Sequence, residues 1–210
     1  ADKEKKAMEA EQKKVDGVCK KVDKIKKDFQ GSTECLDKSR DNMFEMAVTQ
    51  EKKAQILEQE KALQAAKTDE EKITLEQKYK MAKTTAIKEA LDSGELEKKK
   101  LSVEEGKLLV KTIRNMRLAV KKDKKVIELS PKVAKEAEAT TKNVDTKKSA
   151  AIATKVKSLK KAVADDLPAI SKEAPAQVDA LTELLSAANA LRKGNNIEDP
   201  GEPSDEDDWE

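Results

Sequence analysis

Apolar residues recur along this chain at the three- and four-residue spacing of an α-helix, and few residues interrupt the pattern. One such seam is formed by Met8, Val15, Val18, Val22, Ile25 and Phe29. The 210 residues include only six Gly and five Pro, and no β-branched cluster bounded by turns predicts a strand. Because each apolar seam needs a covering helix, the sequence predicts an all-α fold, an elongated antiparallel helical bundle with long helices.

Glycines and capping residues predict where the first helices begin and end. Gly31 is expected to end the first helix, because glycine readily adopts the left-handed conformation of a C-terminal cap. We favour one continuous helix from about Glu34 to Leu91, since apolar positions continue throughout, although Thr68 and Glu71 form a capping box that would begin a new helix.

The second half of the chain is predicted to return as further helices. Gly94 is the expected left-handed residue of the first turn, and Pro131 is expected to restart or kink the helix that follows. A stripe of Leu109, Ile113, Met116, Val120 and Ile127 marks that helix. Residues 165–168 are predicted to break the pattern, and a last short helix is predicted from about Pro175 to Gly194.

Charge divides the chain into two predicted parts. The net charge is +2, yet residues 198–210 hold eight carboxylates and no base, so the remaining 44 bases face 34 acids. We therefore predict a helical-bundle domain over residues 1–193 and an acidic, disordered tail or stalk over residues 194–210. Deleting residues 198–210 should leave the melting temperature nearly unchanged at moderate salt. The lysines of the body alternate with glutamates, which favours solvated helix faces over a nucleic-acid surface.

Nothing in the sequence predicts an enzyme. The chain has no His, the most common general base and metal ligand. Acidic pairs such as Glu104 with Glu105 and Asp165 with Asp166 are expected by chance among 42 acids. We predict no catalytic, cofactor-binding or metal-binding residue.

Cys19 and Cys35 are the only cysteines, and the chain begins with Ala1, which fits a mature secreted protein or a trimmed chain. An even cysteine number in a secreted protein predicts a structural disulfide between them. Such a bridge requires the first helix to end early and residues 29–33 to run back in extended form. Two buried thiols, or redox or metal chemistry, are the alternatives.

The Ala1 start, the Ala- and Glu-rich helical body, the cysteine pair and the tail EDPGEPSDEDDWE together resemble trypanosome surface proteins, in particular the glutamic acid/alanine-rich proteins of the insect-stage coat. The resemblance implies a bundle standing on the extracellular face of the plasma membrane, reached by the secretory pathway. A glycosylphosphatidylinositol anchor added near the C-terminus would hold it to the membrane.

The function that this resemblance implies is that of a non-enzymatic coat glycoprotein, which forms a protective layer and mediates host or vector interaction. Its expected partners are the membrane, through the lipid anchor, and a host or vector protein or glycan, with no nucleic acid. The alternatives are a ligand-binding surface receptor on a helical scaffold, which needs an exposed apolar or charged patch, and a bacterial periplasmic coiled-coil adaptor.

Overall fold

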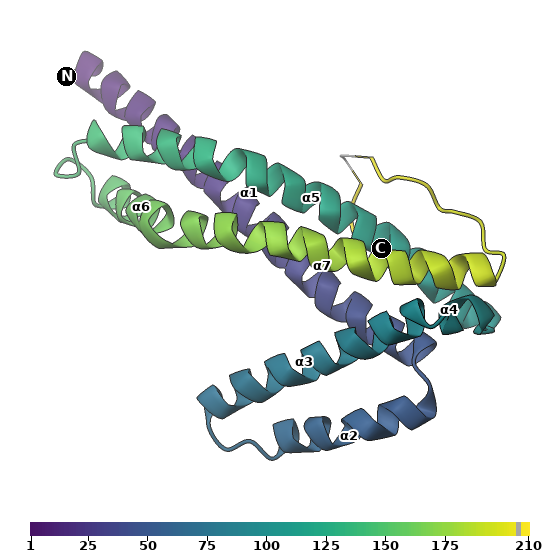
Figure 1. Ribbon diagram of the computed structural model, residues 1–210. Helices are drawn as coiled ribbons and strands as arrows, with labels where there is room; N and C mark the ends of the chain where they lie inside the picture. The colour runs from purple at the N-terminus through teal and green to yellow at the C-terminus, as the bar shows by residue number, and fades with distance from the viewer. Residues whose placement is uncertain (205–206) are drawn as a thin grey trace. The chain divides into compact units, whose positions relative to one another are not determined.

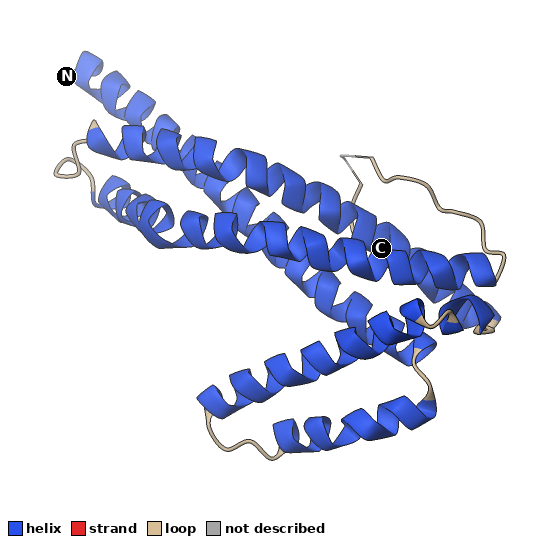
Figure 2. Cartoon of the chain, viewed as in Figure 1, coloured by secondary structure: helices blue, strands red, loops and turns tan. Residues whose placement is uncertain are grey.

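The computed structural model describes residues 1–204 and 207–210; Asp205 and Glu206, two carboxylates of the predicted tail, lie outside the described residues. The described residues form helices and no strand, which confirms the all-α fold (Figure 2). In chain order the elements are α1 (Asp2–Ala47), α2 (Gln50–Gln64), α3 (Asp69–Asp92), α4 (Glu95–Lys98), α5 (Val103–Lys142), α6 (Ala150–Lys161), the π-helical turn η1 (Ala162–Asp166) and α7 (Leu167–Gly194).

The chain divides into two compact units, and each is built from segments that are distant in sequence. Unit 1 comprises Ala1–Thr33 and Lys121–Val178, and unit 2 comprises Glu34–Val120 and Asp179–Glu210. The long helices α1, α5 and α7, which Figure 1 labels, therefore each contribute residues to both units.

The core of unit 1 is the predicted seam of the first helix covered by two later segments. The buried residues from α1 are Val15, Val18, Val22 and Ile25; those from α5 are Val126, Val133 and Ala137; those from the α6 to α7 segment are Leu159, Ala162, Leu167, Ile170 and Ala174. Met8, the first residue of the predicted seam, is 36% exposed, so the covered part begins at Val15.

Polar contacts fix the helix directions in unit 1. Lys21 of α1 pairs with Glu136 of α5 at 2.9 Å, and Asp28, further along α1, pairs with Lys122, earlier in α5, so these helices are antiparallel. Lys26 pairs with Asp166, and the Thr33 hydroxyl, further along α1, donates a hydrogen bond to Gln177 of α7. The two segments therefore run parallel.

Two of the predicted helix ends are wrong. α1 does not end at Gly31 but continues to Ala47, because Ser32 is buried and the apolar stripe resumes at Met43, which together outweigh the roughly 0.5–1 kcal/mol that glycine costs within a helix. The predicted single helix from Glu34 to Leu91 is also interrupted twice, between α1 and α2 and between α2 and α3.

Hydroxyl caps account for both interruptions. The Thr49 hydroxyl accepts a hydrogen bond from the Lys52 amide at the start of α2. The Thr68 hydroxyl accepts from the Glu71 amide at 3.1 Å, while the Glu71 carboxylate accepts from the Lys67 amide at 3.2 Å. The capping box therefore begins α3, as one of the two alternatives predicted.

Prolines and glycines divide the second half less sharply than predicted. α5 continues through Pro131, and α7 begins at Leu167 and continues through Pro175, so the predicted start near Pro175 is wrong. The predicted break at 165–168 falls where the π-helical turn η1 ends and α7 begins. Pro168 lies in the first turn of α7, where proline is tolerated. Gly94 has φ 77°, and α7 ends at Gly194, both as predicted.

The core of unit 2 draws on six helices. Its large buried side chains are Met43, Phe44 and Met46 of α1, Ile87 of α3, Leu96 of α4, Leu109, Ile113 and Met116 of α5, and Leu181, Leu184 and Leu191 of α7. Of α2, only Ile56 is buried, and Leu57 is 42% exposed. The α2 helix is thus held mainly by its pairing with α3.

Candidate ligand-binding site

The two cysteines that the sequence singled out are both thiols in the structure, and each is half-buried. They lie sixteen residues apart on the uninterrupted helix α1, which corresponds to about 24 Å of helical rise. A disulfide needs Cα atoms within about 7 Å, so the predicted bridge between Cys19 and Cys35 is not present, and within one chain it would require α1 to be interrupted. Cys35 Sγ lies 3.7 Å from the Ser39 hydroxyl.

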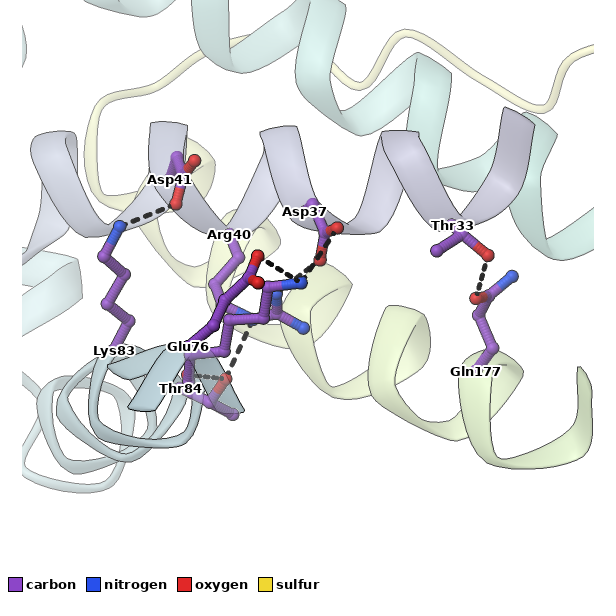
Figure 3. Close-up of polar contacts among 9 residues, drawn as sticks. Thr33, Asp37, Arg40, Asp41, Glu76, Lys83, Thr84 and Gln177 are labelled. Atoms are coloured by element: carbon purple, nitrogen blue, oxygen red, sulfur yellow. Dashed lines mark hydrogen bonds and ion pairs between the residues drawn. The ribbon is translucent and has the colours of Figure 1, made fainter. Parts of the chain in front are cut away.

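A polar layer that the sequence did not predict crosses the core of unit 1. Asp123 of α5 is fully buried, and its Oδ2 accepts a hydrogen bond from Gln177 Nε2 at 2.8 Å. The Gln177 Oε1 in turn accepts from the Thr33 hydroxyl at 2.7 Å (Figure 3). The other carboxylate oxygen, Oδ1, is buried with no hydrogen-bond partner. Each of the three packed segments thus contributes one polar side chain.

This environment changes the acidity of Asp123. Burial raises its pKa from 3.8 to about 6, against the opposing effect of hydrogen bonds from Gln177 and Ser32, and nearby Asp28 raises it further. The cause is loss of hydration, which penalises the charged form of a carboxyl group. Asp123 at the centre of the layer is fully buried, whereas Thr33 at its edge is partly exposed.

A mainly apolar cavity lies in unit 2, between α1, α3 and α7. It has a volume of about 180 Å³. Its apolar wall consists of Leu36 from α1, Ile87 and Leu91 from α3, and Ala180, Leu184 and Ala187 from α7. Ala180 and Ala187 lie two helical turns apart on α7, and their short side chains leave the space that larger residues would fill.

Charged and polar side chains form the rim of this cavity: Arg40, Thr84, Lys88, Asp92, Glu183 and Ser186. Arg40 Nε donates to the Thr84 hydroxyl at 3.0 Å, and its Nη1 donates to Asp37 at 2.9 Å (Figure 3). The bond to Thr84 joins α1 to α3, the bond to Asp37 lies within α1, and the two together fix the guanidinium group at the cavity edge. An apolar pocket with a few fixed polar groups at its rim is the usual form of a small-molecule site.

A further ion pair extends the α1 and α3 contact along the same two helices. Lys83 Nζ lies 2.8 Å from Asp41 Oδ1 (Figure 3). The same nitrogen lies 4.1 Å from the centre of the Tyr79 ring. Lys80 pairs with Asp37 at 3.2 Å. The wall of the cavity formed by α1 and α3 is therefore tied at several points, which favours a site that exists before any ligand binds.

The sequence analysis did not predict this cavity. Whether facing residues fill the space between helices depends on their volumes and on how the helices pair, which helical spacing alone does not reveal. Within residues 1–204 and 207–210, no group of three or more Cys, Asp or Glu side chains is arranged to hold a metal ion. No helix in those same residues is both long and apolar enough to cross a bilayer.

Comparison with known proteins yields no relative: no family model, curated protein or solved structure matches the chain.

Proposed function

We propose that the protein is a non-enzymatic binding protein on a helical scaffold, which holds a small apolar group in the cavity between α1, α3 and α7. The observation that carries this proposal is the cavity itself, about 180 Å³ with six aliphatic side chains in its wall. A dry, apolar cavity of about 150 Å³ is large enough for benzene in other helical proteins. The cavity therefore suits a single aromatic ring or a short aliphatic chain.

The rim selects among apolar ligands by charge. Arg40 and Lys88 lie beside the opening, and Arg40 is fixed by Asp37 and Thr84. Asp92 and Glu183 lie on the same rim, so its net charge is balanced. A neutral ligand, such as an aromatic ring with one hydrogen-bonding group, is the chemical class that such a rim favours.

A ligand-binding experiment tests this proposal directly. Indole should bind the intact chain with one site per molecule and raise its melting temperature, as any ligand that binds only the folded state does. Ala180→Leu should fill the cavity and abolish indole binding. Ala176→Leu, at an exposed position of α7 outside the cavity, is the matched control and should leave binding unchanged. Equal indole binding by both variants, or none by the intact chain, would contradict the proposal.

The second candidate function is the coat glycoprotein suggested by the resemblance to insect-stage trypanosome surface proteins. Its support is the Ala- and Glu-rich helical body with an acidic C-terminus, together with the all-α fold. On this proposal the elongated bundle stands on the extracellular face of the plasma membrane, reached by the secretory pathway and held by a glycosylphosphatidylinositol anchor. Its partners are a host or vector protein or glycan.

Release from cells tests the coat proposal against the periplasmic adaptor, the other alternative that the sequence left open. A coat protein with this anchor should leave the cell surface on treatment with a phosphatidylinositol-specific phospholipase, whereas a bacterial periplasmic adaptor should appear only after the outer membrane is opened. Recovery of the protein from the cytosol alone would exclude the coat proposal.

A further inference from the structure

Within unit 2, the segment that follows α7 is held against α5 and α7 by two arginines. Arg117 of α5 binds both oxygens of Asp199, through Nη1 at 2.5 Å and Nη2 at 3.3 Å, and its Nη1 also donates to the Gly201 carbonyl at 2.9 Å. Arg192 of α7 approaches the same carboxylate at 3.7 Å. The side chains of Arg117 and Arg192 are only 12% and 11% exposed, so these charges are largely removed from water.

A second contact holds the chain end on the same helix. Arg114 Nη1 lies 2.6 Å from Oε1 of Glu210. The side-chain amide of Asn115 accepts from the Glu210 amide at 2.9 Å and donates to the Glu210 carbonyl at 3.3 Å. Asn115 therefore binds the backbone of the segment, which any extended peptide can supply, while Arg114 binds an acidic side chain.

These four residues have the chemistry of a peptide-recognition site. Bidentate pairing of arginine with a carboxylate is directional, and the low exposure of Arg117 strengthens it. The hydrogen bonds from Arg117 and from the Gly201 amide hold the pKa of Asp199 well below its usual range. An asparagine side chain that pairs with both backbone groups of one residue adds contacts independent of sequence.

We propose that Arg114, Asn115, Arg117 and Arg192 form a binding site for an extended acidic peptide, which the chain's own C-terminal segment occupies in the structure. The ligand in trans is an acidic peptide of another protein molecule, with carboxylates spaced as Asp199, Glu202 and Glu210 are in this chain. Glu202 contributes a weaker contact, 3.7 Å from Arg117 Nε. The proposal concerns the tail-facing side of α5 and is independent of the apolar cavity.

The test uses the full-length chain and removes the negative charges of the tail, so that the tail no longer occupies the site. In the triple variant Asp199→Asn, Glu202→Gln, Glu210→Gln, a fluorescein-labelled synthetic peptide of residues 198–210 should bind with a Kd at least about tenfold lower than in the unaltered chain, whose site is filled from within at high effective concentration. Adding Arg117→Ala to the triple variant should raise the Kd of the peptide by about tenfold or more. Lys111 is an exposed base that lies before Arg117 on α5. Adding Lys111→Ala to the triple variant should change the Kd of the peptide by less than about twofold.

Trp209, the only tryptophan, gives an independent measurement in chains with an unaltered tail. Its fluorescence anisotropy should fall toward that of the free peptide in Arg114→Ala/Arg117→Ala and should stay high in Lys111→Ala, with circular dichroism confirming equal helicity. The proposal is overturned if the vacated chain binds the peptide no better with Arg117 than without it. It is equally overturned if Trp209 is as mobile in the unaltered chain as in the peptide.

Discussion

At the residue scale, Asp123 departs most from what helical patterning predicts. The predicted stripe of α5 has a seven-residue gap between Val120 and Ile127, and Asp123 occupies the core position within that gap. Gln177 likewise lies between the buried residues Ala174 and Leu181 of α7. Buried polar groups of this kind are costly unless their partners are all present, and one oxygen of Asp123 has none.

The raised pKa of Asp123 makes a signed prediction about stability and pH. The folded state holds this proton more tightly than the unfolded chain, so stability from this group is greatest below about pH 4 and falls as the pH rises through about 6. A pKa raised from 3.8 to about 6 corresponds to a loss of roughly 3 kcal/mol in the free energy of unfolding at neutral pH. Asp123→Asn should therefore be more stable than the parent by about 1–3 kcal/mol at pH 7 and about equal to it at pH 4.

Urea unfolding of parent and variant at several pH values between 4 and 7 measures this difference. Asp179→Asn, at an exposed position of α7, is the control and should show no such trend. A parent and variant that differ equally at pH 4 and pH 7 would mean that Asp123 does not titrate in this range.

At the element scale, the sequence predicted which residues face a core better than where helices end. The seam from Val15 to Ile25 and the stripe from Leu109 to Met116 are buried as expected. Gly31, by contrast, lies within α1, while Gly94 ends a turn with φ 77°. Both are glycines in polar surroundings, and the difference is decided by packing further along the chain, which local spacing does not contain.

Two glycines within helices offer a matched test of packing between elements. A Cβ atom at Gly194 would lie 2.3 Å from the Glu97 carbonyl oxygen, so α7 and α4 meet there at backbone distance. At Gly17 of α1 a Cβ atom would meet nothing within 4 Å. Gly194→Ala should therefore destabilise the protein by about 1–3 kcal/mol, whereas Gly17→Ala should stabilise it by about 0.5–1 kcal/mol.

Thermal and chemical unfolding of the two alanine variants decide between these signs. If both variants are stabilised, the close approach of α7 to α4 does not exist in solution.

At the scale of the whole molecule, the sequence predicted the fold class but not the division into two units or the fate of the C-terminus. The disordered stalk was inferred from charge density and proline, which describe the segment alone. Whether such a segment binds depends on a complementary surface, and Arg114, Arg117 and Arg192 come together only in the folded chain. The cavity of unit 2 was likewise beyond the reach of spacing, because three helices form it.

The contacts of Asp199 lead us to expect that the tail stabilises the fold, whereas the sequence alone predicted that it contributes little. Deleting residues 198–210 should lower the melting temperature by more than about 5 °C at low salt, because Arg117 and Arg192 lose their carboxylate partner while remaining largely shielded from water. Deleting only residues 203–210 should cost less, since Asp199 remains. Scanning calorimetry measures the melting temperature of both deletion variants. An unchanged melting temperature for the longer deletion would support the disordered stalk that the sequence predicted.

The order of segments in the two units also bears on how the protein is made. Unit 1 begins with the first residue and needs the chain as far as Val178, and unit 2 lies partly inside that interval and partly after it. At about 5–20 residues per second, the ribosome needs on the order of 10 s to proceed from Thr33 to Val178. Until α5 is made, which takes most of that interval, the apolar seam of the nascent α1 has no native partner, so this first helix is a natural client for chaperones.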